Sequence, residues 1–264
     1  MAGAIDPAQT LTTTFKLCNV DVARRKTIGK NEFHALMAAA AESGKYALPR
    51  KEGSDHITPV DHMTATIMTR LPSCFKKGET IVNATDPELL SQAEMEGRKQ
   101  AIEYIRFLRD KVPGYEMAQL STFGMQIGVR ETRRVYGEYR LTKDEVLTAK
   151  QFDDQIGLCG APIEDHHGGE DTAWAYLPDG QCVGIPWGTL VPKGSQNLLM
   201  AGRCFSSTHD AHASVRSMAQ CMAMGEAVGT AAAMMLKEKK APQEIAVSQL
   251  QSALRQSGAI LETP

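Results

Sequence analysis

The clearest hydrophobic pattern in the chain follows Asp86, where apolar residues recur at helical spacing. Asp86 suits the N-cap position, because its side chain can accept hydrogen bonds from the unpaired amides of a helix start. Pro87 suits the first helical turn, because proline has no amide hydrogen that would stay unpaired there. Pro113-Gly114 ends the pattern. The apolar stripe consists of Leu90, Ala93, Ala101, Ile102, Ile105, Leu108 and Val112. The segment between Asp86 and Pro113 is therefore predicted to be one long amphipathic helix.

Weaker patterns predict two further helices and a set of strands. Residues 31–43 favour a helix capped by Asn31, and residues 242–258 favour an amphipathic helix near the end of the chain. Residues 12–17 and 119–140 alternate enough for strands. Residues 44–62 read as a loop or edge structure, and the Gly- and Asp-rich residues 151–182 read as loops.

The C-terminal third contains the most informative passage. Residues 197–201 read as a short buried strand, Gly202 as a turn, and residues from about 217 onward as a long helix rich in small side chains. A helix start carries unpaired N–H groups and partial positive charge, so it can bind an electron-rich ligand atom. Gly225 and Gly229 lie one turn apart and allow a neighbouring backbone to approach closely. A plain core strand packed on an Ala-rich helix is the simpler interpretation.

Composition narrows the possible functions. The 264 residues are 42% hydrophobic and 23% charged, which is ordinary for a globular protein large enough for one or two domains. A formal net charge of −2 gives no electrostatic footprint for nucleic acid. No apolar run reaches the roughly 20 residues of a membrane helix, and the first residues do not resemble a secretory signal. Six scattered cysteines without a C-x-x-C pair favour reduced thiols and a cytoplasmic location.

Several blocks of sequence occur together in the order typical of one family. Residues 110–116 contain a helix-ending V-P-G-aromatic turn, residues 128–134 a G-x-R-E-T-R-R block, and residues 185–192 an I-P-aromatic-x-x-L-V-P hairpin. The strand, turn and helix at residues 197–233 follow them. Over roughly residues 110–260 the chain resembles FAD-dependent oxidoreductases with a glutathione-reductase-like flavin fold. These are distantly akin to the flavoproteins of fumarate reductase and succinate dehydrogenase.

The resemblance lacks one expected part. A complete member opens with a strand, a G-x-G-x-x-G turn and a helix that hold the FAD diphosphate, and this chain has no G-x-G-x-x-G. We therefore expect a mixed α/β fold that corresponds to the C-terminal half of a flavoenzyme. Residues 1–150 would be a substrate-facing α+β domain, and residues 151–264 the returning part of the FAD-binding domain with its final strand and helix. A split subunit, a truncated reading frame and a fragment all remain open.

The resemblance implies a set of cofactor-binding residues. Gly202 and Arg203 would lie near the ribityl chain or diphosphate, although a surface salt bridge is an alternative role for Arg203. The amides of Ser217, Met218 and Ala219 would begin the last helix and stabilise negative charge at the pyrimidine end of the flavin. In the sequence, Gly225 continues the same helix.

Three residues are candidates for the chemistry. Arg216 would add a full positive charge beside the flavin. His209 could carry a proton or contact substrate, because histidine titrates near neutral pH, or it could be a structural, hydrogen-bonded histidine. Arg130 suits an anionic substrate, but the arginines around Glu131 could equally form a structural ion-pair network. Trp187 could lie over the flavin, although a buried aromatic is the simpler role.

These observations lead to one function and one rival. The first is the C-terminal portion or small subunit of an FAD-dependent oxidoreductase, which transfers hydride between FAD and a small organic substrate. It would work with a partner chain that carries G-x-G-x-x-G, or as a homo-oligomer. The rival is a non-catalytic half that folds and oligomerises without binding FAD. No metal site is expected, because His166, His167, Cys159 and Cys182 lack the regular spacing of zinc ligands.

Overall fold

The computed structural model describes residues 8–77, 80–167 and 172–263, and these residues fall into two compact units. Among the described residues, unit 2 contains residues 9–130 and 166–172, and unit 1 contains Ala8 and residues 131–165 and 173–263. After Ala8, the chain passes from unit 2 back to unit 1 at residues 130 and 131, whereas the sequence suggested a division near residue 150. The functional names given to the two parts stay predictions.

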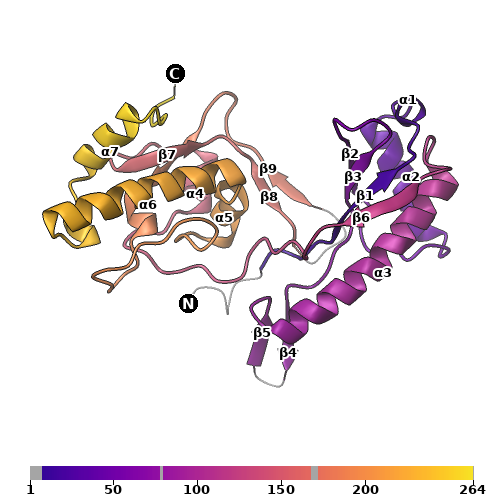
Figure 1. Cartoon of the computed structure of the whole chain (residues 1–264), viewed down its shortest axis with the longest axis horizontal. Helices are drawn as coiled ribbons and strands as arrows, with labels where there is room; N and C mark the ends of the chain where they lie inside the picture. The colour runs from indigo at the N-terminus through magenta and orange to yellow at the C-terminus, as the bar shows by residue number, and fades with distance from the viewer. Residues whose placement is uncertain (1–7, 78–79, 168–171, 264) are drawn as a thin grey trace. The chain divides into compact units, whose positions relative to one another are not determined.

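Unit 2 is built on one antiparallel sheet (Figure 1). Its strands lie in the order β2-β3-β1-β6, and β4 pairs with β5 in a separate hairpin. The strands of the unit are β1 (Thr14–Cys18), β2 (Ser54–Ile57), β3 (Thr64–Ile67), β4 (Cys74–Lys77), β5 (Thr80–Asn83) and β6 (Gln119–Phe123). The prediction of edge structure within residues 44–62 is confirmed by β2, which forms one edge of the sheet.

The helices of unit 2 follow their sequence signals closely. They are α1 (Val22–Arg25), α2 (Lys30–Glu42) and α3 (Pro87–Lys111). The predicted long helix is confirmed: Asp86 caps α3 by accepting hydrogen bonds from the amides of Glu88 and Leu89. The cap of α2 was wrong, because the helix begins at Lys30 after Gly29 and so includes Asn31. Phe15, Phe33, Met37, Tyr104, Phe107 and Leu108 belong to the apolar core of the unit.

Unit 1 is a set of helices around small sheets. Its elements are α4 (Lys143–Leu147), β7 (Gln155–Cys159), β8 (Ile163–Asp165), β9 (Ala173–Ala175), β10 (Val183–Pro186), the 3-10 helix η2 (Trp187–Leu190), α5 (His209–Val215), α6 (Met218–Glu238), the 3-10 helix η3 (Pro242–Glu244) and α7 (Val247–Gln256). Strand β10 pairs with β7, and β8 pairs with β9. Helices α6 and α7 lie side by side (Figure 1).

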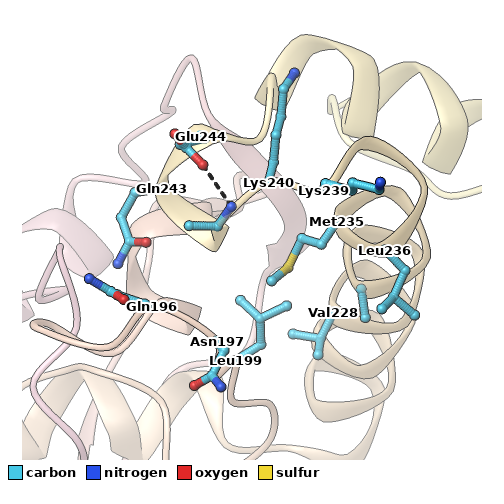
Figure 2. A pocket seen from close by; sticks show the side chains of 12 residues that line it. Gln196, Asn197, Leu199, Val228, Met235, Leu236, Lys239, Lys240, Gln243 and Glu244 are labelled. Atoms are coloured by element: carbon cyan, nitrogen blue, oxygen red, sulfur yellow. Dashed lines mark hydrogen bonds between the residues drawn. The ribbon is translucent and has the colours of Figure 1, made fainter.

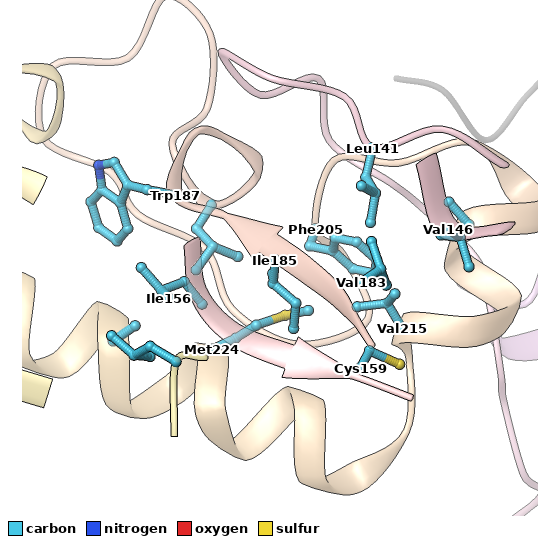
Figure 3. Close-up of a cluster of buried hydrophobic side chains, with 14 of the residues drawn as sticks. Leu141, Val146, Ile156, Cys159, Val183, Ile185, Trp187, Phe205, Val215 and Met224 are labelled. Carbon is cyan, nitrogen blue, oxygen red and sulfur yellow. The ribbon is translucent and has the colours of Figure 1, made fainter. Parts of the chain in front are cut away.

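The core of unit 1 lies between the β7–β10 pair and the helices (Figure 3). Met224 of α6 points toward Ile156 of β7 and Ile185 of β10. Trp187 belongs to the same cluster and is buried, as the simpler interpretation expected. Burial of this apolar surface is what fixes one face of α6.

Several local predictions in unit 1 were wrong. Residues 151–182 contain three strands rather than loops alone, and residues 128–140 form irregular structure rather than a strand. Residues 185–192 form the end of a strand and a 3-10 helix instead of a hairpin. Residues 197–201 are not a strand, and Leu198 is 56% exposed, because no neighbouring strand pairs with them among the described residues.

Candidate functional site

A buried carboxylate, Glu131, lies at the centre of a charged cluster in unit 1. Its side chain is 1% exposed, and its Oε1 atom lies 2.7 Å from Nε of the equally buried Arg134. Its Oε2 atom lies 2.9 Å from Nδ1 of His209. A buried carboxylate is tolerated only with such partners, because an unpaired charge in the protein interior is strongly destabilising.

His209 joins this carboxylate to a second one. Its Nε2 atom lies 3.0 Å from Oδ1 of Asp165, at the end of β8. Burial lowers the pKa of His209, but hydrogen bonds to Asp165 and Glu131 raise it more, and the resulting pKa is about 9. Burial raises the pKa of Glu131, but the bond to His209 and nearby cations bring it below its usual value. At neutral pH the cluster therefore consists of an imidazolium between two carboxylates.

The start of α5 and the loop before it explain why His209 lies between Glu131 and Asp165. Thr208 caps α5 by accepting from the amide of Ala211, which makes His209 the first residue of the helix. The preceding loop is held by Arg134, whose Nη1 atom donates to the Ser207 carbonyl oxygen at 2.7 Å. On the next turn of α5, Nε2 of His212 lies 2.9 Å from the carbonyl oxygen of Arg203.

His212 is a structural neighbour of the cluster rather than part of its charge. Its side chain is fully buried, and desolvation is the main reason why its pKa falls to about 4. The imidazole is thus neutral at physiological pH.

The start of α6 leaves hydrogen-bond donors available. Ser217 is the N-cap, but its side chain makes no capping bond, so the first amides of α6 keep their donor capacity. Beside it, Arg216 donates from Nη2 to the Glu164 carbonyl oxygen at 3.1 Å. Its Nε atom is buried and has no hydrogen-bond partner among the described residues. Burial lowers the pKa of Arg216, but an arginine pKa is high enough for the side chain to stay charged.

These donors fit one end of a flavin. A guanidinium with an unused N–H and an uncapped helix start together favour an electron-rich ring edge. The hydroxyl groups of Ser206 and Ser207 are also buried without a hydrogen-bond partner among the described residues. No G-x-G-x-x-G turn is present for the diphosphate. The chain therefore supplies groups that suit the ring and lacks the usual ones for the dinucleotide.

The remaining predicted residues are less closely grouped. Gly202 has φ +83, which favours glycine and confirms the predicted turn. The Arg203 side chain is exposed. Ala219 lines a groove of about 640 Å³ together with residues of β7 and α7, and Gly225 is exposed on α6. Arg130 belongs to unit 2, where its Nη1 atom donates to Oγ1 of Thr12 at 2.6 Å.

Sequence reasoning missed a cationic cluster in unit 2. Arg50 and Arg70 are each 7% exposed, and an Nη2 atom of each lies within 3.3 Å of Oγ1 of Thr172. Nδ1 of His166 lies 3.3 Å from the same oxygen. No local motif marks this cluster, because Thr172 lies 122 residues from Arg50 and 102 residues from Arg70 along the chain.

A large cavity of unit 1 is separate from these groups (Figure 2). It has a volume of about 1090 Å³ and lies between the second half of α6, η3 and the loop near Asn197. Its walls include Leu199, Val228 and Met235, with Lys239 at the edge. None of the predicted catalytic or cofactor residues lines it.

Two negative findings apply to the described residues. No group of three or more His, Cys, Asp or Glu side chains is arranged to hold a metal ion. In the same part of the chain, every helix is too short or too polar to cross a bilayer. The thiol of Cys159 is buried and lies 3.7 Å from the Ser214 carbonyl oxygen.

Comparison with known proteins identifies the family. The model of the family described as FAD dependent oxidoreductase matches residues 2–254. No curated protein and no solved structure matches the chain. The match spans nearly the whole sequence and agrees with the blocks that suggested a flavoenzyme. The chain therefore belongs to the FAD-dependent oxidoreductase family, and its cofactor is FAD.

Proposed function

We propose that this chain supplies the flavin-ring and substrate walls of an oxidoreductase that transfers hydride between FAD and a small organic substrate. A partner chain with a G-x-G-x-x-G turn would hold the diphosphate. The observation that carries the proposal is the uncapped start of α6 beside Arg216, a partly buried side chain whose buried Nε atom has no hydrogen-bond partner among the described residues. When bound, FAD supplies the centre that accepts or donates the hydride.

The α6 start and Arg216 would bind the electron-rich edge of the ring. Amides from Ser217 to Ala219 point out of the helix end, and Arg216 adds a full positive charge. The unused Nε–H of Arg216 is a buried donor, and such a group gains most from an anionic acceptor. Gly202 and Arg203 would contact the chain that leads from the ring to the diphosphate.

His209 would carry a positive charge and serve as a proton donor. Its two ring nitrogens are engaged by Glu131 and Asp165, so at neutral pH it has no lone pair with which to accept a proton. This favours an acid or a structural role over that of a base. Arg130 would contact an anionic substrate from unit 2, whereas Arg134 fills the structural ion-pair role with Glu131.

The exposed side of α6 supports a partner. Met218, Met222 and Leu236 are 79%, 71% and 83% exposed, and they share a face with Gly225 and Gly229. A Cβ atom added at either glycine would meet nothing within 4 Å. Contiguous exposed apolar surface of this kind marks an interface.

Redox titration of the reconstituted holoenzyme tests the two arginines. Loss of one charge-assisted contact in a dry site is worth about 1.5–3 kcal/mol, so Arg216→Ala should lower the flavin midpoint potential by roughly 30–60 mV. The direction follows because the positive charge of Arg216 favours the more negative form of the cofactor. Arg130→Ala should raise KM or lower turnover and leave the potential nearly unchanged.

An exposed arginine provides the control. Arg98 on α3 has a side chain that is 54% exposed, so Arg98→Ala should change neither the potential nor KM. If Arg130→Ala shifts the potential and Arg216→Ala does not, the two roles are inverted. If neither variant differs from Arg98→Ala, the proposed site is wrong.

A further inference from the structure

Two aromatic side chains are exposed side by side on the β8–β9 hairpin. Trp174 lies in β9, and Tyr176 is the first residue after this strand. The two residues are two positions apart, so the alternation of side chains along a strand places both on one face. They are 44% and 70% exposed, whereas Trp187 is 5% exposed in the core of the same unit. Their ring centroids are 6.2 Å apart, and the ring planes differ by 12°. The nearly parallel pair is a stacking surface for a third planar ring.

The hairpin connects this surface to the cationic start of α6. Trp174 pairs across the strands with Glu164. The carbonyl oxygen of Glu164 in turn accepts a hydrogen bond from Arg216, the residue before the uncapped Ser217. Glu164 therefore links the aromatic pair to Arg216, because it is the cross-strand neighbour of Trp174 and its carbonyl oxygen binds the guanidinium. This combination suits a planar heteroaromatic ring with an electron-rich edge, because stacking holds the face and the cationic groups hold the edge.

We propose that Trp174 and Tyr176 form an aromatic platform on which the isoalloxazine ring of the flavin stacks. The proposal rests on the proposed function, which places the ring edge at Arg216, and adds the surface that receives the ring face. The platform also removes one face of the ring from water. We propose a ring, and not another protein surface, as the occupant because the positive charge of Arg216 complements an electron-rich ring edge.

Riboflavin is the probe, because it contains the ring without the diphosphate and therefore does not need a G-x-G-x-x-G turn. The intact chain is titrated into riboflavin, and the quenching of riboflavin emission on stacking gives the dissociation constant. Trp174→Ala should weaken binding about tenfold, in line with the worth of aromatic stacking. Trp174→Phe should retain most of the affinity. Tyr136, which is also exposed, provides the control variant Tyr136→Ala, and it should bind like the wild type.

Three results would overturn the platform. One is the absence of quenching by the wild-type chain up to the solubility limit of riboflavin. Another is an unchanged affinity in Trp174→Ala, with folding checked by circular dichroism. If this variant instead weakens binding of the partner chain, the aromatic pair is a protein interface and the platform is wrong.

Failure of the platform can be told from failure of the proposed function. If Trp174→Ala binds riboflavin normally while the reconstituted holoenzyme carries FAD, the platform fails and the proposed function stands. If the wild-type chain stacks riboflavin through Trp174 but no partner allows FAD to bind, the platform stands and the proposed function fails.

Discussion

The two longest helices, α3 in unit 2 and α6 in unit 1, use their small residues in opposite ways. Gly97 of α3 is buried, and a Cβ atom added there would lie 1.9 Å from Oγ1 of Thr13. At Gly225 and Gly229 of α6 an added Cβ atom would meet nothing within 4 Å. A neighbouring segment of the chain therefore packs closely against the glycine of α3, whereas no such segment packs against Gly225 or Gly229 of α6 among the described residues.

The same contrast holds for the faces of the two helices. Helix α3 buries a continuous stripe that includes Tyr104 and Leu108, whereas the buried residues of α6 are Met224, Ala227 and Ala231. The opposite face of α3 carries charged residues such as Glu96, Lys99 and Arg106, whereas the exposed face of α6 carries Met218, Met222 and Leu236. The difference indicates that unit 2 completes its own core, while unit 1 presents a helix face that another polypeptide segment can cover.

The starts of the helices differ as well. Asp86 caps α3 with two amide hydrogen bonds, and Ser217 leaves the amides of α6 without a side-chain cap. A cap of this kind typically contributes about 1 kcal/mol, so the open start of α6 represents stability that a ligand could restore. The start of α3 is thus satisfied within the chain, whereas the start of α6 is open to the electron-rich ligand that we propose.

The largest expected effect comes from the cluster that holds the loop before α5 and α6. Glu131→Gln should lower the free energy of unfolding by about 3–5 kcal/mol, because it removes the buried carboxylate charge that pairs with Arg134. Glu103→Gln on α3 is the matched control. Its ion pair with Arg106 is partly exposed and should contribute no more than about 1 kcal/mol. Urea denaturation measures both, and equal losses would contradict the comparison.

The next effect is a dependence of stability on alkaline pH. Desolvation by burial lowers the pKa of His209, but hydrogen bonds to Asp165 and Glu131 raise it more, from 6.5 to about 9. The resulting stabilisation, about 3 kcal/mol, is present in full below pH 6.5 and is lost as pH rises toward 9. His209→Gln should remove this slope. Unfolding curves recorded from pH 6 to pH 10 would count against the charged cluster if both proteins lost stability in parallel.

The smallest effects separate the glycines directly. Gly97→Ala should destabilise the chain by about 1–3 kcal/mol, because its new methyl group clashes with Thr13. Gly229→Ala should stabilise the isolated chain by up to about 1 kcal/mol, since alanine favours a helix and nothing obstructs it. The same variant should weaken association with a partner. A stable Gly97→Ala protein, or a Gly229→Ala protein that assembles normally, would remove the distinction between α3 and α6.

The sequence predicted elements whose signals are local. Helix α3 was identified from Asp86, Pro87 and Pro113, and the start of α6 at Ser217 was also correct. Strands β7, β8 and β9 were missed, because a Gly- and Asp-rich composition hides short strands that depend on partners elsewhere in the chain. The expected strand at residues 197–201 is absent, since a hydrophobic run becomes a strand only when another strand pairs with it.

The candidate site divides in the same way. The helix start beside Arg216 and Ser217 was predicted correctly, whereas the roles that the family resemblance implies for these two residues stay predictions. The bridge from Glu131 through His209 to Asp165 could not be predicted as a unit, because 78 residues separate Glu131 from His209. Side chains that meet only through tertiary folding carry no common sequence signal.

The most direct test of the central claim is the visible absorbance of the purified chain after incubation with FAD and removal of unbound cofactor by gel filtration. The account predicts a nearly colourless chain alone. Mixed with a chain that carries G-x-G-x-x-G, it should elute as a larger, yellow complex with one FAD per pair. No colour in that complex would support the non-catalytic rival. A stoichiometric yellow protein without any partner would contradict the account.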